Sequence, residues 1–381
     1  MIAVIVFWAS IAFVIYVLFG YPVLLAILAR RRRPIRKQFQ QQVTVSVLLP
    51  VRNGERWIRQ KLESILALDY PSELVDIIVV SDGSTDATAA IAEEFAGSGV
   101  QILCLPPRGK AVALNAALQH ATGEILFFTD VRQRLAPDSL NHLVACFSDP
   151  EVGVVSGELV ILEGDTHEEA SVGQYWTYEK WIRRGLSGID SILGATGSIY
   201  AVRRELAVPL PAGTLLDDVH QPLAAFFRGY RVIFDDAAKA YDFPTSLDSE
   251  FRRKVRTQTG MYQIIRHYPA LLGSDNRMWI HFMSHKMGRM LMPFALIVTF
   301  VSAFWLPGVL APAAVLGQAG FYAIALLDRW IPDGVLLKRV SSPIRTFTVL
   351  MAAAFCAPFA AIACPERLWT QTEVKRARTS E

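Results

Sequence analysis

Charged residues are scarce in this chain. Only 19% of the 381 residues are Asp, Glu, Lys or Arg, whereas 52% are hydrophobic and the mean hydropathy is +0.31. An ordinary soluble domain carries about a quarter charged residues. Intrinsic disorder and a purely soluble class are therefore both disfavoured. The formal net charge is only +3, which gives little support to binding of nucleic acid.

Several familiar binding motifs are also missing. The four cysteines form no C-x-x-C pair, which argues against a zinc ribbon and against a disulfide framework. Neither G-x-G-x-x-G nor G-x-x-x-x-G-K-[ST] occurs in the sequence. A dinucleotide-binding fingerprint and a P-loop are thereby excluded.

The hydrophobic residues are concentrated at the two ends of the chain. Residues 2–29 contain no acidic or basic side chain, and about 20 apolar residues are enough for a helix to cross a bilayer. A signal peptide has a shorter apolar stretch of about 7–15 residues and a preceding positive cluster. Here the basic residues follow instead, from Arg30 to Lys37. Residues 1–30 thus predict a transmembrane helix with Met1 outside and the chain after Arg30 in the cytoplasm.

The carboxy-terminal region carries further candidate spans, at residues 291–306, 309–327 and 344–363. We expect two to three transmembrane helices within residues 291–365, followed by a tail at 366–381. Residues 276–290 mix aromatic, Met and basic side chains. They predict either an interfacial amphipathic helix or simply the flank of the next span. The chain is therefore expected to be an integral membrane protein with lipid as a partner.

Residues 41–275 between these spans have the pattern of an α/β domain. Apolar strand patterns and helical patterns alternate along the first half of this stretch. Such alternation predicts a mostly parallel sheet with helices on both faces. The expected strands are 43–49, 74–80, 101–105 and 124–129, and the expected helices are 58–66, 85–95 and 111–120. Ligands of such sheets bind at the carboxyl ends of the strands.

Polar residues follow each of these four strands. The sequences are PVRNGE at 50–55, DGSTD at 82–86, RGK at 108–110 and a single acid at Asp130. Each one alone is ordinary turn, capping or loop chemistry. Four in succession at one edge of a sheet indicate a ligand site.

The set resembles the family-2 glycosyltransferases with the GT-A fold, in the membrane-embedded branch related to cellulose, chitin and hyaluronan synthases. The P-x-x-N-E-like turn appears at 50–55, the D-D-G-S-x-D-x-T run as SDGSTDAT at 81–88, and the G-K-x-x-A-L-N run as GKAVALN at 109–115. Farther on, LGATG at 193–197 is similar to the acceptor-side glycine loop. LDDV at 216–219 matches the acidic E-D motif, with Asp217 in place of Glu. RRKVRT at 252–257 stands where the family has Q-x-x-R-W and retains only Arg256.

The resemblance implies an inverting glycosyltransferase that uses a nucleotide-diphosphate sugar, with a UDP-sugar as the expected donor. A carboxylate is the usual base for the acceptor hydroxyl, and Asp218 is assigned that role. Asp130 is assigned to Mg²⁺ or Mn²⁺, which would balance the charge of the leaving diphosphate. Arg132 stands at the usual second acidic position and could instead contact the diphosphate directly. The remaining donor-binding residues are expected to be Pro50, Asn53, Glu55, Asp82, Lys110, Arg253 and Arg256, and the acceptor residues Gly194, Gly197 and Asp217.

The acceptor is expected to be lipid-linked or a saccharide close to the membrane. In processive synthases of this family a Trp stacks on the acceptor, and Thr257 in its place cannot do so. This favours transfer of one or a few sugars. Two alternatives stay open: a processive polysaccharide synthase of the same fold, and an inactive nucleotide-binding membrane scaffold.

Overall fold

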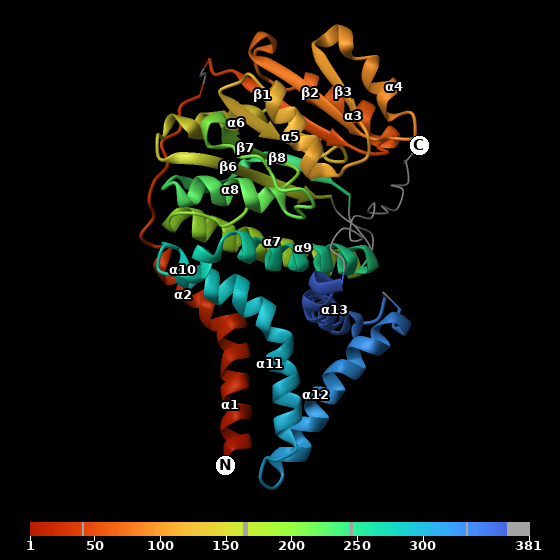
Figure 1. Cartoon of the computed structure of the whole chain (residues 1–381). Coiled ribbons are helices and arrows are strands. Elements are labelled where there is room, and N and C mark those ends of the chain that lie inside the picture. Colours follow the sequence, from red (N-terminus) through yellow and green to blue (C-terminus); the bar gives the residue numbers. More distant parts are fainter. Residues whose placement is uncertain (40–41, 163–166, 244–246, 333, 364–381) are drawn as a thin grey trace. The chain divides into compact units, whose positions relative to one another are not determined.

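The computed structural model describes residues 1–39, 42–162, 167–243, 247–332 and 334–363 (Figure 1). The chain divides into two compact units. The first consists of Met1–Arg30, Glu163–Ile182 and Phe243–Glu381, and the second of Arg31–Leu162 and Arg183–Asp242. Helix α7 (His167–Ile189) begins in the first unit and ends in the second.

The second unit is built on an eight-stranded sheet with the order β3-β2-β1-β4-β7-β6-β8-β5. Strands β3, β2, β1 and β4 are parallel, as the alternating pattern predicts. Beyond β4 the sheet is mixed, because β7 is antiparallel to both of its neighbours and β5 is antiparallel to β8. The strands are β1 (Val45–Val51), β2 (Val75–Asp82), β3 (Val100–Leu105), β4 (Ile125–Phe128), β5 (Arg134–Leu135), β6 (Val152–Ile161), β7 (Tyr200–Arg203) and β8 (Arg231–Asp242).

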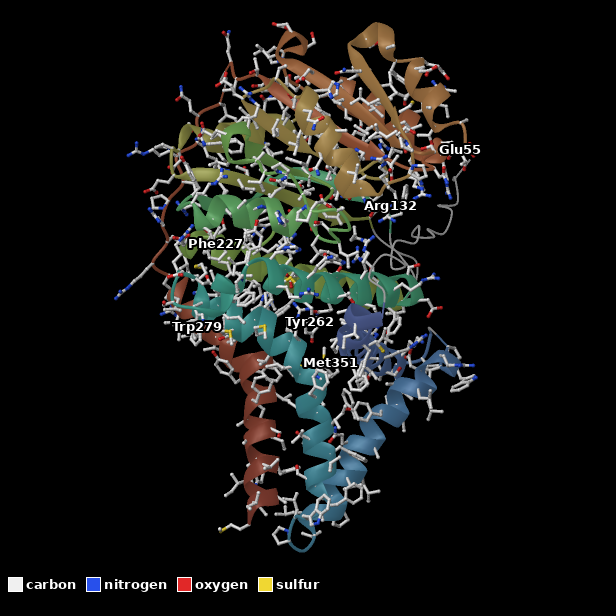
Figure 2. The ribbon with its side chains drawn as sticks, viewed as in Figure 1. Glu55, Arg132, Phe227, Tyr262, Trp279 and Met351 are labelled. Carbon is white, nitrogen blue, oxygen red and sulfur yellow. The ribbon has the colours of Figure 1, made fainter. Side chains whose placement is uncertain are left out.

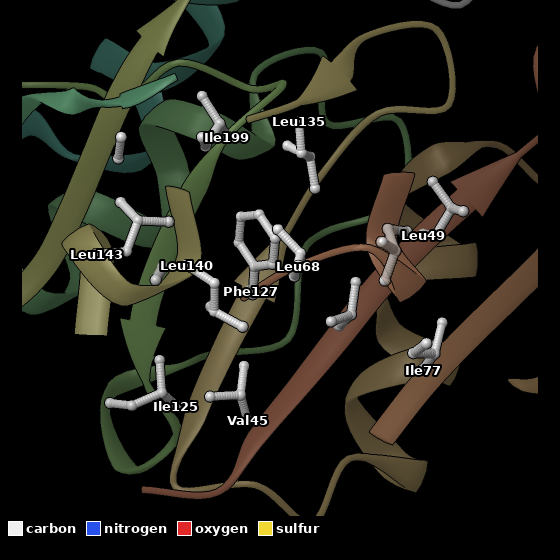
Figure 3. Close-up of a cluster of buried hydrophobic side chains, with 14 of the residues drawn as sticks. Val45, Leu49, Leu68, Ile77, Ile125, Phe127, Leu135, Leu140, Leu143 and Ile199 are labelled. Atoms are coloured by element: carbon white, nitrogen blue, oxygen red, sulfur yellow. The ribbon is translucent and has the colours of Figure 1, made fainter. Parts of the chain in front are cut away.

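Helices cover both faces of this sheet, so the expected α/β architecture is confirmed. Successive side chains of a strand point to opposite faces, and Val45, Val47 and Leu49 of β1 share one buried cluster with residues of α3, α4 and α6. Figure 3 labels Val45 and Leu49 of this cluster together with Leu140 and Leu143 of α6. Helix α5 packs on β1 and β2 without contributing to that cluster, which places it on the other face. These helices are α3 (Glu55–Leu66), α4 (Thr88–Glu93), α5 (Lys110–His120) and α6 (Ser139–Ala145), and α8 (Asp217–Phe227) packs on β6, β7 and β8.

The bounds of several elements differ from those expected, most clearly at β1 and at the helix expected over 85–95. The strand β1 was expected to end before Pro50 but runs through it to Val51. Proline removes a backbone donor, yet the pairing of β1 with β4 has already ended at Leu48, so no ladder bond to β4 is lost at Pro50. The helix expected over 85–95 is shorter, since α4 covers only Thr88–Glu93. Residues 84–87 instead form a loop whose backbone N–H groups donate to the side chains of Asn53 and Glu55, which follow β1.

The basic segment after residue 30 is bound to the rest of the second unit by ion pairs and hydrogen bonds. Arg33 pairs with Glu151 at 2.7 Å and Lys37 with Asp235 at 2.8 Å. The buried Arg231 donates to the backbone carbonyls of Arg33 and Pro34. Arg33 and Lys37 therefore anchor this segment to the sheet-containing part of the second unit.

The first unit is helical. Four of its described helices are long and apolar enough to cross a membrane: Ile2–Leu28, Trp279–Ala303, Leu310–Trp330 and Lys338–Ile362. Apolar helices at both ends of the chain are thereby confirmed. Their parts are α1 (Ile2–Ile15), a π-helical turn (Tyr16–Gly20), α2 (Tyr21–Leu28), α10 (Trp279–His281), a second π-helical turn (Phe282–Met287), α11 (Gly288–Ala303), α12 (Leu310–Leu327) and α13 (Lys338–Ala363), and the unit also contains α9 (Leu247–His267).

Candidate functional site

The loops that follow β1 and β2 are joined by side-chain hydrogen bonds. Asn53 adopts a positive φ of 50°, and its Oδ1 accepts the backbone N–H of Thr85 at 2.8 Å. The Oε2 atom of Glu55 accepts the N–H of Ala87 at 3.0 Å. Both predicted donor-binding side chains therefore fix the neighbouring loop. Figure 2 labels Glu55, in the first turn of α3, and Arg132, in the turn after β4.

Asp82, at the end of β2, holds the loop that precedes α5. Its carboxylate accepts the N–H of Arg108 at 2.7 Å and that of Gly109 at 2.9 Å, and only 4% of the residue is exposed. Gly83 has a φ of +63°, and a Cβ there would lie 2.6 Å from the ring of Pro107. The close approach of these two loops sets the position of Lys110, the first residue of α5.

The Lys110 ammonium lies between two carboxylates from distant parts of the chain. Its Nζ atom is 2.8 Å from Oδ1 of Asp130, after β4, and 3.0 Å from Oδ1 of Asp217, at the start of α8. Burial alone would lower the pKa of this lysine, but the two carboxylates outweigh that effect and raise it. Lys110 is therefore a fixed positive charge at the point where three strand-end loops meet.

Asp217 and Asp218 begin α8, where the helix dipole stabilises negative charge. The Tyr200 hydroxyl donates to Oδ2 of Asp217 at 3.4 Å. Asp218 is half-buried. Its desolvation, reinforced by the adjacent Asp217 and opposed by Lys110, raises the pKa of Asp218 to about 6. A carboxylate with this pKa is ionised at neutral pH and is a better proton acceptor than an ordinary Asp.

The predicted acceptor loop lies directly against Asp218. The N–H of Ala195 donates to the Asp218 backbone carbonyl at 2.6 Å. A Cβ at Gly197 would stand 3.2 Å from Oδ2 of Asp218, and one at Gly194 would stand 3.0 Å from Cγ2 of Val219. Small residues at both positions allow the loop to approach the carboxylate, so the structure brings Gly194 and Gly197 next to the start of α8 at Asp217 and Asp218.

The other predicted residues belong to other elements or have ion-pair partners of their own. Pro50 is inside β1, opposite Val80. Arg132 donates to the buried Asp242 at 2.5 Å, so its guanidinium is bound to the end of β8. Arg253 and Arg256 belong to α9 in the first unit, where Arg253 pairs with Glu250 at 2.8 Å.

The cluster could hold a divalent cation only if a bound ligand supplied part of its coordination. Asp130 offers hard oxygen ligands of the kind that Mg²⁺ and Mn²⁺ prefer, and 39% of its side chain is accessible. Among the described residues, however, no group of three or more His, Cys, Asp or Glu side chains could hold a metal ion. A cation at Asp130 would need further ligands from a bound phosphate and water.

Sequence reasoning missed three residues around this cluster. Tyr200 on β7 contacts Asp217, and Arg183 near the end of α7 donates to Oγ1 of Thr196 in the acceptor loop at 2.7 Å. Lys61 is buried behind the turn that carries Asp130. Only Lys61 had a signal in the sequence, because it interrupts the apolar face formed by Ile58, Leu62 and Ile65.

Parts of this chain are similar to known glycosyltransferases. Residues 46–208 match the family model described as glycosyl transferase family 2. A probable glycosyltransferase, YdaM of Bacillus subtilis, is 25% identical over 259 residues, which is 62% of this chain and 59% of that protein. The β-monoglucosyldiacylglycerol synthase of Nostoc is 30% identical over 195 residues, 48% of this chain and 40% of the synthase.

A third relative, a poly-β-1,6-N-acetyl-D-glucosamine synthase of Staphylococcus epidermidis, is 32% identical over 126 residues, 32% of this chain and 30% of the synthase. The chain thus spans less than two thirds of the length of each of these relatives. Among solved structures, the mannosyltransferase PcManGT of Pyrobaculum calidifontis, in complex with GDP-Man and Mn²⁺, superimposes with a TM-score of 0.73 at 24% identity. That alignment covers 94% of this chain and 99% of PcManGT and supports the GT-A fold.

Proposed function

We propose that this chain, whose residues 46–208 match the family model of glycosyl transferase family 2, is an inverting glycosyltransferase. It moves a sugar from a nucleotide-diphosphate donor to a lipid-linked or membrane-proximal hydroxyl. The observation that carries the proposal is the Lys110 ammonium between Asp130 and Asp217, with Asp218 beside them. One cluster then combines a cation for the departing diphosphate with a carboxylate base.

In the proposed reaction Asp218 takes the proton of the acceptor hydroxyl as that oxygen attacks the anomeric carbon. The bond between this carbon and the diphosphate oxygen breaks, and its electron pair leaves with the nucleoside diphosphate. A single displacement of this kind inverts the anomeric centre. Lys110 stabilises the negative charge that develops on the leaving group, and Asp217 holds Lys110 in place.

A divalent cation would be held by Asp130 together with the donor's phosphates. When bound, it would supply a Lewis acid that balances the leaving diphosphate. The GT-A fold shared with PcManGT, which was solved with GDP-Man and Mn²⁺, is compatible with such a donor and cation. Arg132 would act on the diphosphate only if it exchanged its ion pair with Asp242.

The four apolar helices support association of the chain with a membrane. The basic run after residue 30 favours a cytoplasmic second unit. The likeness to a β-monoglucosyldiacylglycerol synthase is compatible with a lipid acceptor. The likeness to a poly-β-1,6-N-acetyl-D-glucosamine synthase keeps a saccharide acceptor and a polymeric product as the second candidate.

The proposal is tested with the full chain in nanodiscs and a panel of UDP- and GDP-sugars, with lipid extract or oligosaccharide as acceptor. We expect transfer, or slow release of the nucleoside diphosphate, with one donor of the panel. The anomeric configuration and the length of the product then decide inversion and processivity. Binding of nucleotides without release of sugar would favour an inactive scaffold instead.

The pH dependence follows from the base. Because Asp218 must be ionised to accept a proton, kcat/KM is expected to fall about tenfold per pH unit as the pH drops below about 6, and to level off above it. The profile is measured with a donor whose own ionisation is constant in that range. If kcat/KM instead fell only below about pH 4, the range of an ordinary Asp, Asp218 would not be the base.

The cation site is tested by Asp130→Ala. Since Asp130 would be the only protein carboxylate on the cation, we expect the donor KM to rise about tenfold or more and the activation by Mn²⁺ to be lost. The matched control is Asp138→Ala, whose side chain is 61% exposed and outside the cluster. An unchanged titration with Mn²⁺ or Mg²⁺ in Asp130→Ala would exclude this residue as a ligand.

A further inference from the structure

The second unit contains a lysine within its core. Lys61 lies on the inner face of α3 with the apolar residues Ile58, Leu62 and Ile65, and only 1% of its surface is exposed. A lysine of this length usually extends its ammonium to water. A buried ammonium loses hydration and needs hydrogen-bond acceptors in compensation. The place and identity of those acceptors indicate what Lys61 does.

Both acceptors belong to the turn that carries Asp130. The Lys61 Nζ atom donates to Oγ1 of Thr129 at 2.6 Å and to the backbone carbonyl of Gln133 at 2.7 Å. Lys61 therefore binds the two ends of the turn 129–133. Burial lowers the pKa of Lys61 to about 7, and the neighbouring Asp130 carboxylate opposes that shift.

The contact continues from this turn to the acceptor loop. The Thr129 hydroxyl accepts from Lys61 and donates its own proton to the backbone carbonyl of Ser198 at 2.7 Å. Ser198 follows Gly197, which lies against the Asp218 carboxylate. A chain of two hydrogen bonds, Lys61–Thr129–Ser198, thus connects the turn bearing Asp130 to the loop beside Asp218.

The other end of the turn has a separate anchor. Arg132 and the side-chain amide of Gln133 both donate to Asp242, at 2.5 and 2.8 Å, and the following β5 pairs with β8. These contacts do not reach the acceptor loop. The hydrogen bond from this turn to Ser198, next to that loop, comes from Thr129, which Lys61 holds.

We propose that Lys61 is a positioning residue for sugar transfer: by holding Thr129 it sets the distance between Asp130 on the donor side and Asp218 on the acceptor side. The inference rests on the proposed function, since it assigns these two carboxylates to opposite sides of one reaction. A displacement of about 1 Å between reacting groups can cost about a hundredfold in rate. The nucleotide-side loops at 53–55 and 82–88 have no hydrogen bond to Lys61 in the structure, so binding of the nucleotide should not depend on it.

The test compares Lys61→Met with Arg59→Met in the full chain in nanodiscs. Arg59 is on the same helix, but its side chain is 49% exposed. We expect Lys61→Met to lower kcat about tenfold or more while the dissociation constant of the nucleoside diphosphate changes less than about threefold. Arg59→Met should match the wild type in both. A Lys61→Met protein that keeps kcat within about twofold, per mole of folded enzyme, would overturn the inference.

A second pair of variants keeps the inference testable if Lys61→Met does not fold. Thr129→Ser retains the hydroxyl and should keep near-wild-type kcat, whereas Thr129→Val removes it and should reproduce the loss. If Lys61 acts through this hydroxyl, the double variant Lys61→Met/Thr129→Val is no slower than the worse single variant. Equal rates for Thr129→Ser and Thr129→Val would overturn the inference. Absence of transfer by the wild type would instead overturn the proposed function, and the inference with it.

Discussion

Replacing Asp218 by Asn is expected to reduce sugar transfer by about a hundredfold to ten-thousandfold, the usual contribution of a general base. Asn keeps the shape of the side chain but accepts no proton at neutral pH. The nucleotide should still bind, because the loops that hold Asp82 and Asn53 do not involve Asp218. Transfer is measured as product formed per mole of folded enzyme, and binding of the nucleoside diphosphate by calorimetry on the same preparation.

The stability of this variant separates a catalytic from a structural role. Asp218 lies next to Asp217 with a raised pKa, so its ionised form is disfavoured in the folded protein. Removing that charge is therefore expected to leave the melting temperature unchanged or to raise it at pH 7–8. Asp138→Asn, at an exposed position, is the matched control and is expected to transfer sugar at the wild-type rate. An Asp218→Asn protein that retains a third or more of the wild-type rate would refute the assignment of the base.

The sequence predicted the parallel half of the sheet because its signals there are local. Apolar strands alternate with amphipathic or small-residue helices from β1 to β4, and each period is visible within a few residues. The mixed half depends on pairings between distant segments, such as β6 with β8, which no local pattern specifies. For the same reason the sequence indicated Asp130, Asp217 and Lys110 as separate motif positions, without their ion pairs.

Side chains that hold other parts of the site in place were harder to predict than those expected to contact the substrate. Asn53, Glu55 and Asp82 were predicted to contact the donor, and in the structure their carboxylate and amide oxygens bind backbone N–H groups of adjacent loops. The motif positions are therefore also structural positions that hold the site in shape. The contacts of Lys61, in contrast, could not be predicted. Its helical spacing places it among apolar residues, and its partners Thr129 and Gln133 lie about seventy residues away along the chain.

Replacing Lys110 by Met is expected to abolish transfer and also to destabilise the second unit. The variant leaves Asp217, which is 5% exposed, without the ammonium that lies 3.0 Å from it. Breaking a buried ion pair by removing one partner costs about 3–5 kcal/mol. The partly exposed Asp130 is screened by solvent, so the loss should lie near the lower end of that range. Lys239→Met, on β8 and outside the cluster, is the matched control.

The pH dependence of that destabilisation has a definite sign. In Lys110→Met the Asp218 carboxylate loses a cation that opposes the rise of its pKa, so its folded-state pKa rises further above that of the unfolded chain. A carboxylate with a raised folded-state pKa destabilises the ionised protein as the pH increases. The difference in melting temperature between wild type and Lys110→Met should therefore shrink as the pH is lowered from 8 to 5. A difference that is constant over this range would contradict the electrostatic account.

Adding Asp217→Asn to Lys110→Met separates stability from catalysis. The second change removes the unpaired buried charge, so it should recover most of the lost melting temperature at pH 8. It should not recover transfer, because the departing diphosphate still lacks the Lys110 ammonium. If the double variant regained both stability and rate, Lys110 would be only the structural partner of Asp217, and charge stabilisation of the leaving group would have to come from elsewhere.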